Sequence, residues 1–183
     1  INTHAGTLPN ALHVSGSARL EVAPRCGFSG NVSGVGTLDY RTNYVRPDVT
    51  GNWSAFTGQL NVTTAGSGDF RIAPSYAWSG LPNASVNLAS GTYFYMSGIV
   101  NNGAGTTIPI GALSGASGSH LRGGPTGDRT LTYRIGGKNV DATFAGSISE
   151  QAPTTITALI KTGSAMWTLS GLCSHRGATE IES

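Results

Sequence analysis

The chain has 183 residues and a formal net charge of +2, and only 11% of its residues are charged. Its Lys and Arg residues are scattered and form no basic stripe, so we expect no nucleic-acid partner. No apolar run approaches the length of a membrane span, so we expect no membrane partner and no signal peptide in this sequence. Low charge and many hydroxyl and amide side chains suit a secreted protein that meets neutral polysaccharide.

Short strand-like runs dominate the sequence. Gly is frequent (27 residues), but 38% of the residues are apolar, which is enough for a core. Helix signals are almost absent, and only residues 10–14 could form one helical turn. The other runs are rich in Val, Ile, Thr and aromatic residues and are bounded by Gly, Ser, Asn or Pro, as is typical of strands. In chain order we expect strands at residues 18–23, 36–40, 59–63, 69–73, 85–88, 92–97, 106–110, 129–135, 141–144, 154–161, 166–169 and 179–181.

Alternation within these runs predicts which side chains face the core. In residues 92–96, Phe94 and Met96 share one face and Tyr93 and Tyr95 share the other. Phe94 and Met96 form the natural core pair, which places both tyrosines outside. The run at residues 59–63 repeats the pattern, with Leu and Val inward and Gln, Asn and Thr outward.

Residues 157–183 indicate the fold most clearly. They contain three short strand runs, separated by Gly-centred turns with no helix between them, which is the rhythm of one turn of a parallel β-helix. With roughly 20–25 residues per rung, we expect an all-β parallel β-helix of about eight rungs. An antiparallel β-sandwich is the alternative, because it would show the same alternation. Tight Asn-Gly hairpin turns are scarce, however, and this favours the β-helix.

The two cysteines are expected to lie in opposite end rungs. Rungs stack about 4.8 Å apart, which places Cys26 and Cys173 roughly 30 Å from each other. A disulfide requires Cα atoms within roughly 7 Å. We therefore predict two unpaired, mostly buried thiols.

Several segments resemble secreted bacterial proteins of the autotransporter-associated β-strand repeat type. The segments are YRIGGKNVDATFAGSI (residues 133–148), IKTG (160–163), WTLSG (167–171), GALSG (111–115) and NWSAFTG (52–58). The resemblance covers most of the chain and is strongest over residues 108–183. It implies a right-handed parallel β-helix, such as occurs in autotransporter stalks and beside polysaccharide-degrading catalytic domains. The nearest relatives it suggests are β-helical xylan-binding modules attached to xylanases.

One departure from that pattern lies near the end of the chain. The last repeat of the family usually carries an Asn-Thr-Tyr-like turn, whereas this chain has Cys173, Ser174 and His175. The family provides no binding motif that can be transferred residue by residue, so a site has to be argued from chemistry.

The sequence offers little for catalysis or for metal binding. Acid/base catalysis and Ca²⁺ sites on β-helices require clustered carboxylates, and the nine acidic residues form no strand-borne pair except Glu180 and Glu182 near the end. Stacking of Asp48 on Asp69, or of Asp128 on Glu150, stays open. The four histidines have no ligand spacing. We therefore expect a non-catalytic chain without cofactor or metal.

Sugar recognition requires less than catalysis does. Pyranose rings stack their C–H faces on aromatic side chains, while Asn, Gln, Asp and Arg bind the hydroxyls. Two pairs with i, i+2 spacing could form a ladder along the helix axis, and Trp53 could extend it, with arginines as polar partners. The candidate carbohydrate-binding residues are Trp53, Arg71, Tyr76, Trp78, Tyr93, Tyr95, Arg122 and Arg129. The remaining aromatics that we interpret as packing residues are Phe28, Phe56, Phe70, Phe94, Phe144 and Trp167.

These observations favour a single carbohydrate-binding domain over residues 1–183, cut from a larger secreted protein. We expect it to be monomeric, to bind a plant β-glycan, xylan by preference, and to hold a glycoside hydrolase of the same parent chain near its substrate. A structural stalk or adhesin segment is one alternative, because the same rungs need no ligand there. A polysaccharide lyase is the other.

Overall fold

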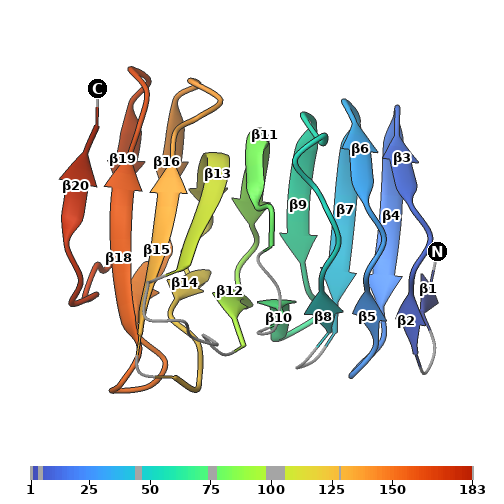
Figure 1. Ribbon diagram of the computed structural model, residues 1–183, viewed down its shortest axis with the longest axis horizontal. Helices are drawn as coiled ribbons and strands as arrows, with labels where there is room; N and C mark the ends of the chain where they lie inside the picture. The colour runs from blue at the N-terminus through green and yellow to red at the C-terminus, as the bar shows by residue number, and fades with distance from the viewer. Residues whose placement is uncertain are drawn as a thin grey trace.

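Parallel pairing joins the strands of successive coils throughout the described part of the chain (Figure 1). The computed structural model describes residues 2–3, 6–43, 47–73, 78–97, 106–127 and 129–182. It forms a right-handed parallel β-helix, as expected, and no antiparallel pairing occurs among the described strands. The coils run along one axis from the blue N-terminal end to the red C-terminal end.

The first sheet is the longest, and nine strands form its main path. Side chains along its strands alternate between the core and the outer side, for example in β7 and β9. The apolar side of each strand therefore faces the same core, coil after coil. The strands of the path are β1 (Asn2–Thr3), β4 (Ser17–Val22), β7 (Thr37–Thr42), β9 (Gln59–Thr63), β11 (Leu81–Leu88), β13 (Thr106–Gly115), β15 (Thr130–Ile135), β18 (Ile156–Lys161) and β20 (Thr179–Ile181). Beside it, β16 (Ala142–Phe144) pairs with β13 and with β19 (Trp167–Leu169).

The second sheet has seven strands. Its strands are β2 (Thr7–Leu8), β5 (Gly27–Phe28), β8 (Asp48–Val49), β10 (Gly68–Ile72), β12 (Thr92–Met96), β14 (His120–Arg122) and β17 (Ser147–Ser149). A short third sheet pairs β3 (Leu12–Val14) with β6 (Val32–Gly34). The possible helical turn at residues 10–14 is therefore wrong, because this segment ends in a strand that pairs with the next coil.

Stacked aromatic rings fill the interior between the sheets. Phe70 and Phe94 occupy register-paired positions of β10 and β12, and their rings stack with centroids 4.9 Å apart. Trp53 packs edge-on against Phe28 and against Phe70. The five phenylalanines interpreted as packing residues are all buried, and Trp167 packs partly buried against the core.

Glycine at the coil corners permits the close stacking of the coils. Gly34 has φ +105°, and a Cβ there would lie 2.2 Å from the carbonyl oxygen of Val14 in the coil below. A Cβ on Gly36 would lie 2.1 Å from the carbonyl oxygen of Gly16. Any larger residue would force these coils apart, which explains the two glycines on either side of Val35.

Both cysteines are free thiols. Cys26 is buried, as expected. Cys173 is exposed, which corrects the prediction of burial, because the last coil has no further coil stacked on it among the described residues. Partial desolvation nevertheless raises the pKa of the Cys173 thiol.

The described residues include no helix that is long and apolar enough to cross a membrane.

Candidate functional site

The outer side of the second sheet carries large polar and aromatic side chains on three neighbouring strands, β10, β12 and β14. In β10, β12 and β14 the inward positions hold Phe70, Phe94 and Leu121, so the residues on either side of each face outward. The parallel register then places Asp69 beside Tyr93, and Tyr93 beside His120. Side chains that are 24 and 27 positions apart thus form one row along the helix axis.

A groove of about 510 Å³ lies over this row. Four successive coils contribute to it, through β10, β12, β14 and the segment after β17. Four of the predicted binding residues meet here, which are Arg71, Tyr93, Tyr95 and Arg122. Among the described residues, the lining consists of Ser67, Asp69, Arg71, Tyr93, Tyr95, Ser97, Arg122, Pro125, Thr126 and Gln151.

Tyr95 faces outward as predicted, but it is not exposed. Only 4% of its surface is accessible, which corrects the expectation, because neighbouring side chains on the same face cover it. Its hydroxyl donates a 2.7 Å hydrogen bond to Oδ2 of Asp69. Burial, and then this hydrogen bond, raise the pKa of the Tyr95 hydroxyl. Tyr95 therefore forms the floor of the groove and not a free aromatic platform.

Tyr93 is half-buried and is also in contact with its neighbours. Its ring stacks on the His120 ring with centroids 4.4 Å apart and an interplanar angle of 5°. The guanidinium carbon of Arg122 lies 4.1 Å from the Tyr93 centroid and 4.9 Å from that of Tyr95. These contacts occupy aromatic surface on which a sugar ring would otherwise stack.

The two arginines of the groove differ in their partners. Arg71 forms an ion pair with Asp48 of the preceding coil, with 2.5 Å between Nη2 and Oδ1, and its Nε donates to the same oxygen. Arg122 has no carboxylate within salt-bridge distance in the described part of the chain. Its Nε is buried without a hydrogen-bond partner. The guanidinium of Arg122 is thus the one held by aromatic contacts alone.

Trp53 and Trp78 do not belong to this groove, which corrects the predicted aromatic ladder. Trp53 is fully buried, and its Nε1 donates to the carbonyl oxygen of Thr50. Trp78 is 6% exposed and packs against Trp53 and Phe70. Neither residue lies on a regular strand, so alternation does not determine its direction.

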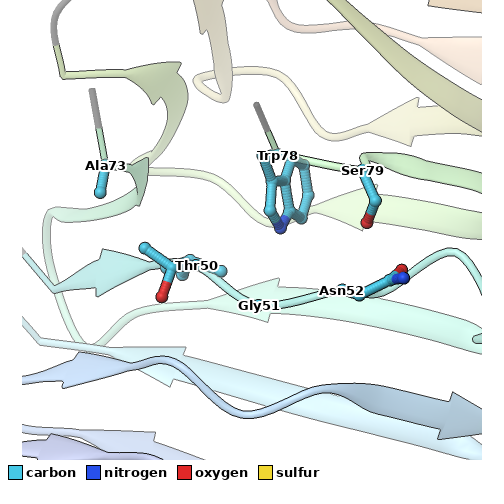
Figure 2. Close-up of a pocket in the computed structure, with 7 residues that line it drawn as sticks. Thr50, Gly51, Asn52, Ala73, Trp78 and Ser79 are labelled. Carbon is cyan, nitrogen blue, oxygen red and sulfur yellow. The ribbon is translucent and has the colours of Figure 1, made fainter. Parts of the chain in front are cut away.

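A second cavity of about 400 Å³ lies beside Trp78 (Figure 2). The picture shows the indole ring above the segment of Thr50 and Gly51, with Ala73 on one side and Ser79 on the other. The predicted site residue Tyr76 lies outside the described residues.

Arg129, the last of the predicted residues, precedes β15 and does not line the groove. The sequence interpretation missed other lining residues, notably Asp69 and Gln151. Asp69 occupies an outward position of β10, one coil before Tyr93. The parallel register would have revealed this, but the register requires coil lengths that the sequence does not specify.

Asp48 does not stack on Asp69, the first of the two acidic pairs that the sequence left open. Asp48 pairs in register with Arg71, and Asp69 with Tyr93. Asp128 lies outside the described residues. No cluster of three or more potential metal ligands occurs among the residues that the structure describes.

Histidines contact hydroxyl groups at three places. His120 Nδ1 lies 2.7 Å from Ser147 Oγ, His13 lies 3.1 Å from Ser33 Oγ, and His175 contacts a threonine. Burial, and then Arg122, lower the pKa of His120. Because such pairs recur along the β-helix, the pair at His120 is not by itself a sign of a nucleophile.

Comparison with known proteins gave no match to a family model and none to a curated protein sequence.

Proposed function

We propose that this β-helix is a non-catalytic carbohydrate-binding module that holds a plant cell-wall β-glycan in the groove of the second sheet. Xylan is the first candidate. The observation that carries the proposal is the groove itself, in which hydroxyl, amide, tyrosine and guanidinium groups of four coils converge. With coils about 4.8 Å apart, four coils extend about 14 Å along the axis, which suits a chain-like ligand.

The chemistry of the lining supports sugar binding. The Tyr93 hydroxyl has no hydrogen-bond partner among the described residues, and neither does the Arg122 guanidinium. Both project from paired strands, so a ligand meets groups whose backbone is already ordered, and little conformational entropy is lost on binding. Hydroxyl groups of a glycan accept and donate hydrogen bonds at such positions.

The setting of the module follows from the composition and from the resemblance described above. In this proposal the module is a monomeric part of a longer secreted bacterial protein. It keeps a glycoside hydrolase of the same chain near its polysaccharide. Support for this setting comes from the sequence alone.

Affinity electrophoresis tests the proposal. The protein is run through native gels that contain xylan, mixed-linkage glucan or mannan, and we expect retardation in xylan. Unchanged mobility in all three gels would overturn the proposal and favour a structural stalk.

Two variants connect binding to the groove. Tyr93→Ala removes a half-buried ring of the groove, and we expect it to lose most of the retardation. Asn87→Ala changes an outward residue of the first sheet and serves as the matched control, with retardation like that of the wild type. Equal retardation of both variants would place binding elsewhere, and thermal unfolding confirms that each variant is folded.

A further inference from the structure

The charges in and beside the groove fall into two sets. Arg71 is neutralised by its ion pair with Asp48. Asp69 is 3% exposed, and one of its oxygens accepts the Tyr95 hydroxyl. Its charge therefore lies at the floor and is already partly satisfied.

Arg122 is in a different position. A guanidinium has five N–H donors in a planar fork. No hydrogen bond from the Arg122 side chain to any described residue is found, and its Nε is shielded from solvent. The two tyrosine rings lie 4.1 Å and 4.9 Å from its guanidinium carbon and hold the fork in place. Such an arrangement is preorganised for an acceptor that a ligand supplies.

We infer that Arg122 binds a carboxylate of the glycan, so that the groove takes a polysaccharide that carries uronic acid in preference to a neutral one. This inference rests on the proposed function. A carboxylate matches the guanidinium fork through two parallel hydrogen bonds, which are shorter and stronger than those to a neutral hydroxyl. A neutral sugar would satisfy the donors but would leave the charge of Arg122 unpaired.

The preference for a carboxylate comes from the local geometry of Arg122 and not from an overall positive electrostatic potential around the groove. The four charged groups Asp48, Asp69, Arg71 and Arg122 carry two positive and two negative charges, which sum to zero. Long-range attraction of polyanions is therefore weak at this surface. We expect a polyanion with unsuitable spacing, such as polyglutamate, not to bind.

Calorimetric titration with two forms of one polymer tests the inference. The first form is glucuronoxylan, and the second is the same polymer with its carboxyl groups reduced to alcohols. We expect reduction to weaken binding by the wild-type protein at least about tenfold, the effect of losing a charge-assisted hydrogen bond. In Arg122→Gln both forms should bind with the weak affinity that the reduced form has for the wild type.

Two further variants make the result specific. Arg122→Lys keeps the charge but loses the planar fork, so it should recover only part of the preference. Arg134→Gln removes an arginine on the first sheet that pairs with Glu182, and it should leave the preference unchanged. Thermal unfolding and circular dichroism of each variant show whether it is folded.

The outcomes separate this inference from the proposed function. Equal wild-type affinity for both polymer forms would overturn the inference and leave carbohydrate binding intact. Binding of polyglutamate as tight as that of glucuronoxylan would also overturn it. Failure to bind either polymer form, together with no retardation in any gel, would remove the proposed function and the inference with it.

Discussion

On both long sheets the parallel register aligns outward side chains of successive coils in rows. The two sheets differ in how the side chains of these rows are hydrogen-bonded. On the first sheet, Asp39, Asn61, Asn87 and Ser114 form a row of short polar side chains. Asn61 Nδ2 donates to Asp39 Oδ1 at 2.9 Å, and Ser114 Oγ donates to Asn87 Oδ1 at 3.2 Å. On the second sheet the side chains of the corresponding row are larger, and Arg122 has no polar partner among the described residues.

The turn after β15 makes this difference larger. Lys138 extends over the first sheet, and its Nζ donates to the carbonyl oxygen of Thr57 at 2.8 Å. Burial lowers the pKa of Lys138. These side chains of the first sheet are thus hydrogen-bonded within the protein, whereas the Arg122 guanidinium of the second sheet has no polar partner among the described residues. Stacked coils build either kind of surface, and the pairing of the outward side chains decides which one results.

Truncation of Tyr95 should have the largest effect on the second sheet. Tyr95→Ala removes a buried ring and leaves Asp69 without its donor, so we expect a loss of about 3 kcal/mol in the free energy of unfolding. Glycan retention should be lost as well, because the ring supports Arg122. Chemical denaturation and affinity electrophoresis measure the two effects.

Tyr95→Phe is the control for this prediction. It keeps the ring and loses only the hydrogen bond to Asp69, at a cost of about 2 kcal/mol. Retention should remain close to that of the wild type. A Tyr95→Ala protein as stable as the wild type would show that the floor of the groove is not as the structure describes it.

Asn61→Ala should have a smaller effect, confined to stability. The change removes the donor to Asp39, and we expect a loss of about 1 kcal/mol in the free energy of unfolding. Glycan retention should be unchanged, because the residue lies on the other sheet. Lost retention in a folded Asn61→Ala protein would mean that the first sheet also takes part in binding.

Asp48→Asn should change stability less still. The ion pair with Arg71 is partly exposed on the Asp48 side, so we expect a change below about 1 kcal/mol. The substitution releases a second guanidinium into the groove, and affinity for glucuronoxylan should rise a few-fold while that for the carboxyl-reduced polymer stays constant. Lower affinity would show that Arg71 must be held by Asp48 to act.

The sequence predicted side-chain direction best for residues that lie on regular strands. Alternation correctly placed Phe94 and Met96 inside and Tyr93 outside. It could not place Trp53 and Trp78, because neither residue lies on a regular strand.

The sequence could not predict the burial of an outward-facing residue either. Tyr95 has the predicted direction, but Asp69 and Arg122 cover it from coils that are 26 and 27 positions away. The length of each coil determines these neighbours. Coil lengths vary along this chain, since Ser17 pairs with Thr37 but Tyr93 with His120. Sequence periodicity therefore predicts the coils but not the site that spans them.

The pH dependence of stability should show the smallest effect, through His120. Its pKa is lowered from the ordinary value of 6.5, first by burial and then by the nearby Arg122 charge. Between pH 6.5 and its lower pKa in the folded protein, the unfolded chain binds a proton that the folded protein does not. Stability should therefore fall as the pH drops from 7 to 5. The fall should be smaller in His120→Gln, which thermal unfolding at both pH values measures.

Arg122→Gln distinguishes the two causes of this shift. Burial of His120 beside Tyr93 is the larger cause, and it remains when the Arg122 charge is removed. Most of the pH dependence attributed to His120 should therefore persist in Arg122→Gln, although glycan preference is lost. If the dependence disappeared together with the charge, electrostatic repulsion and not desolvation would control the proton on this side of the groove. The stacked rings would then be more hydrated than their burial indicates.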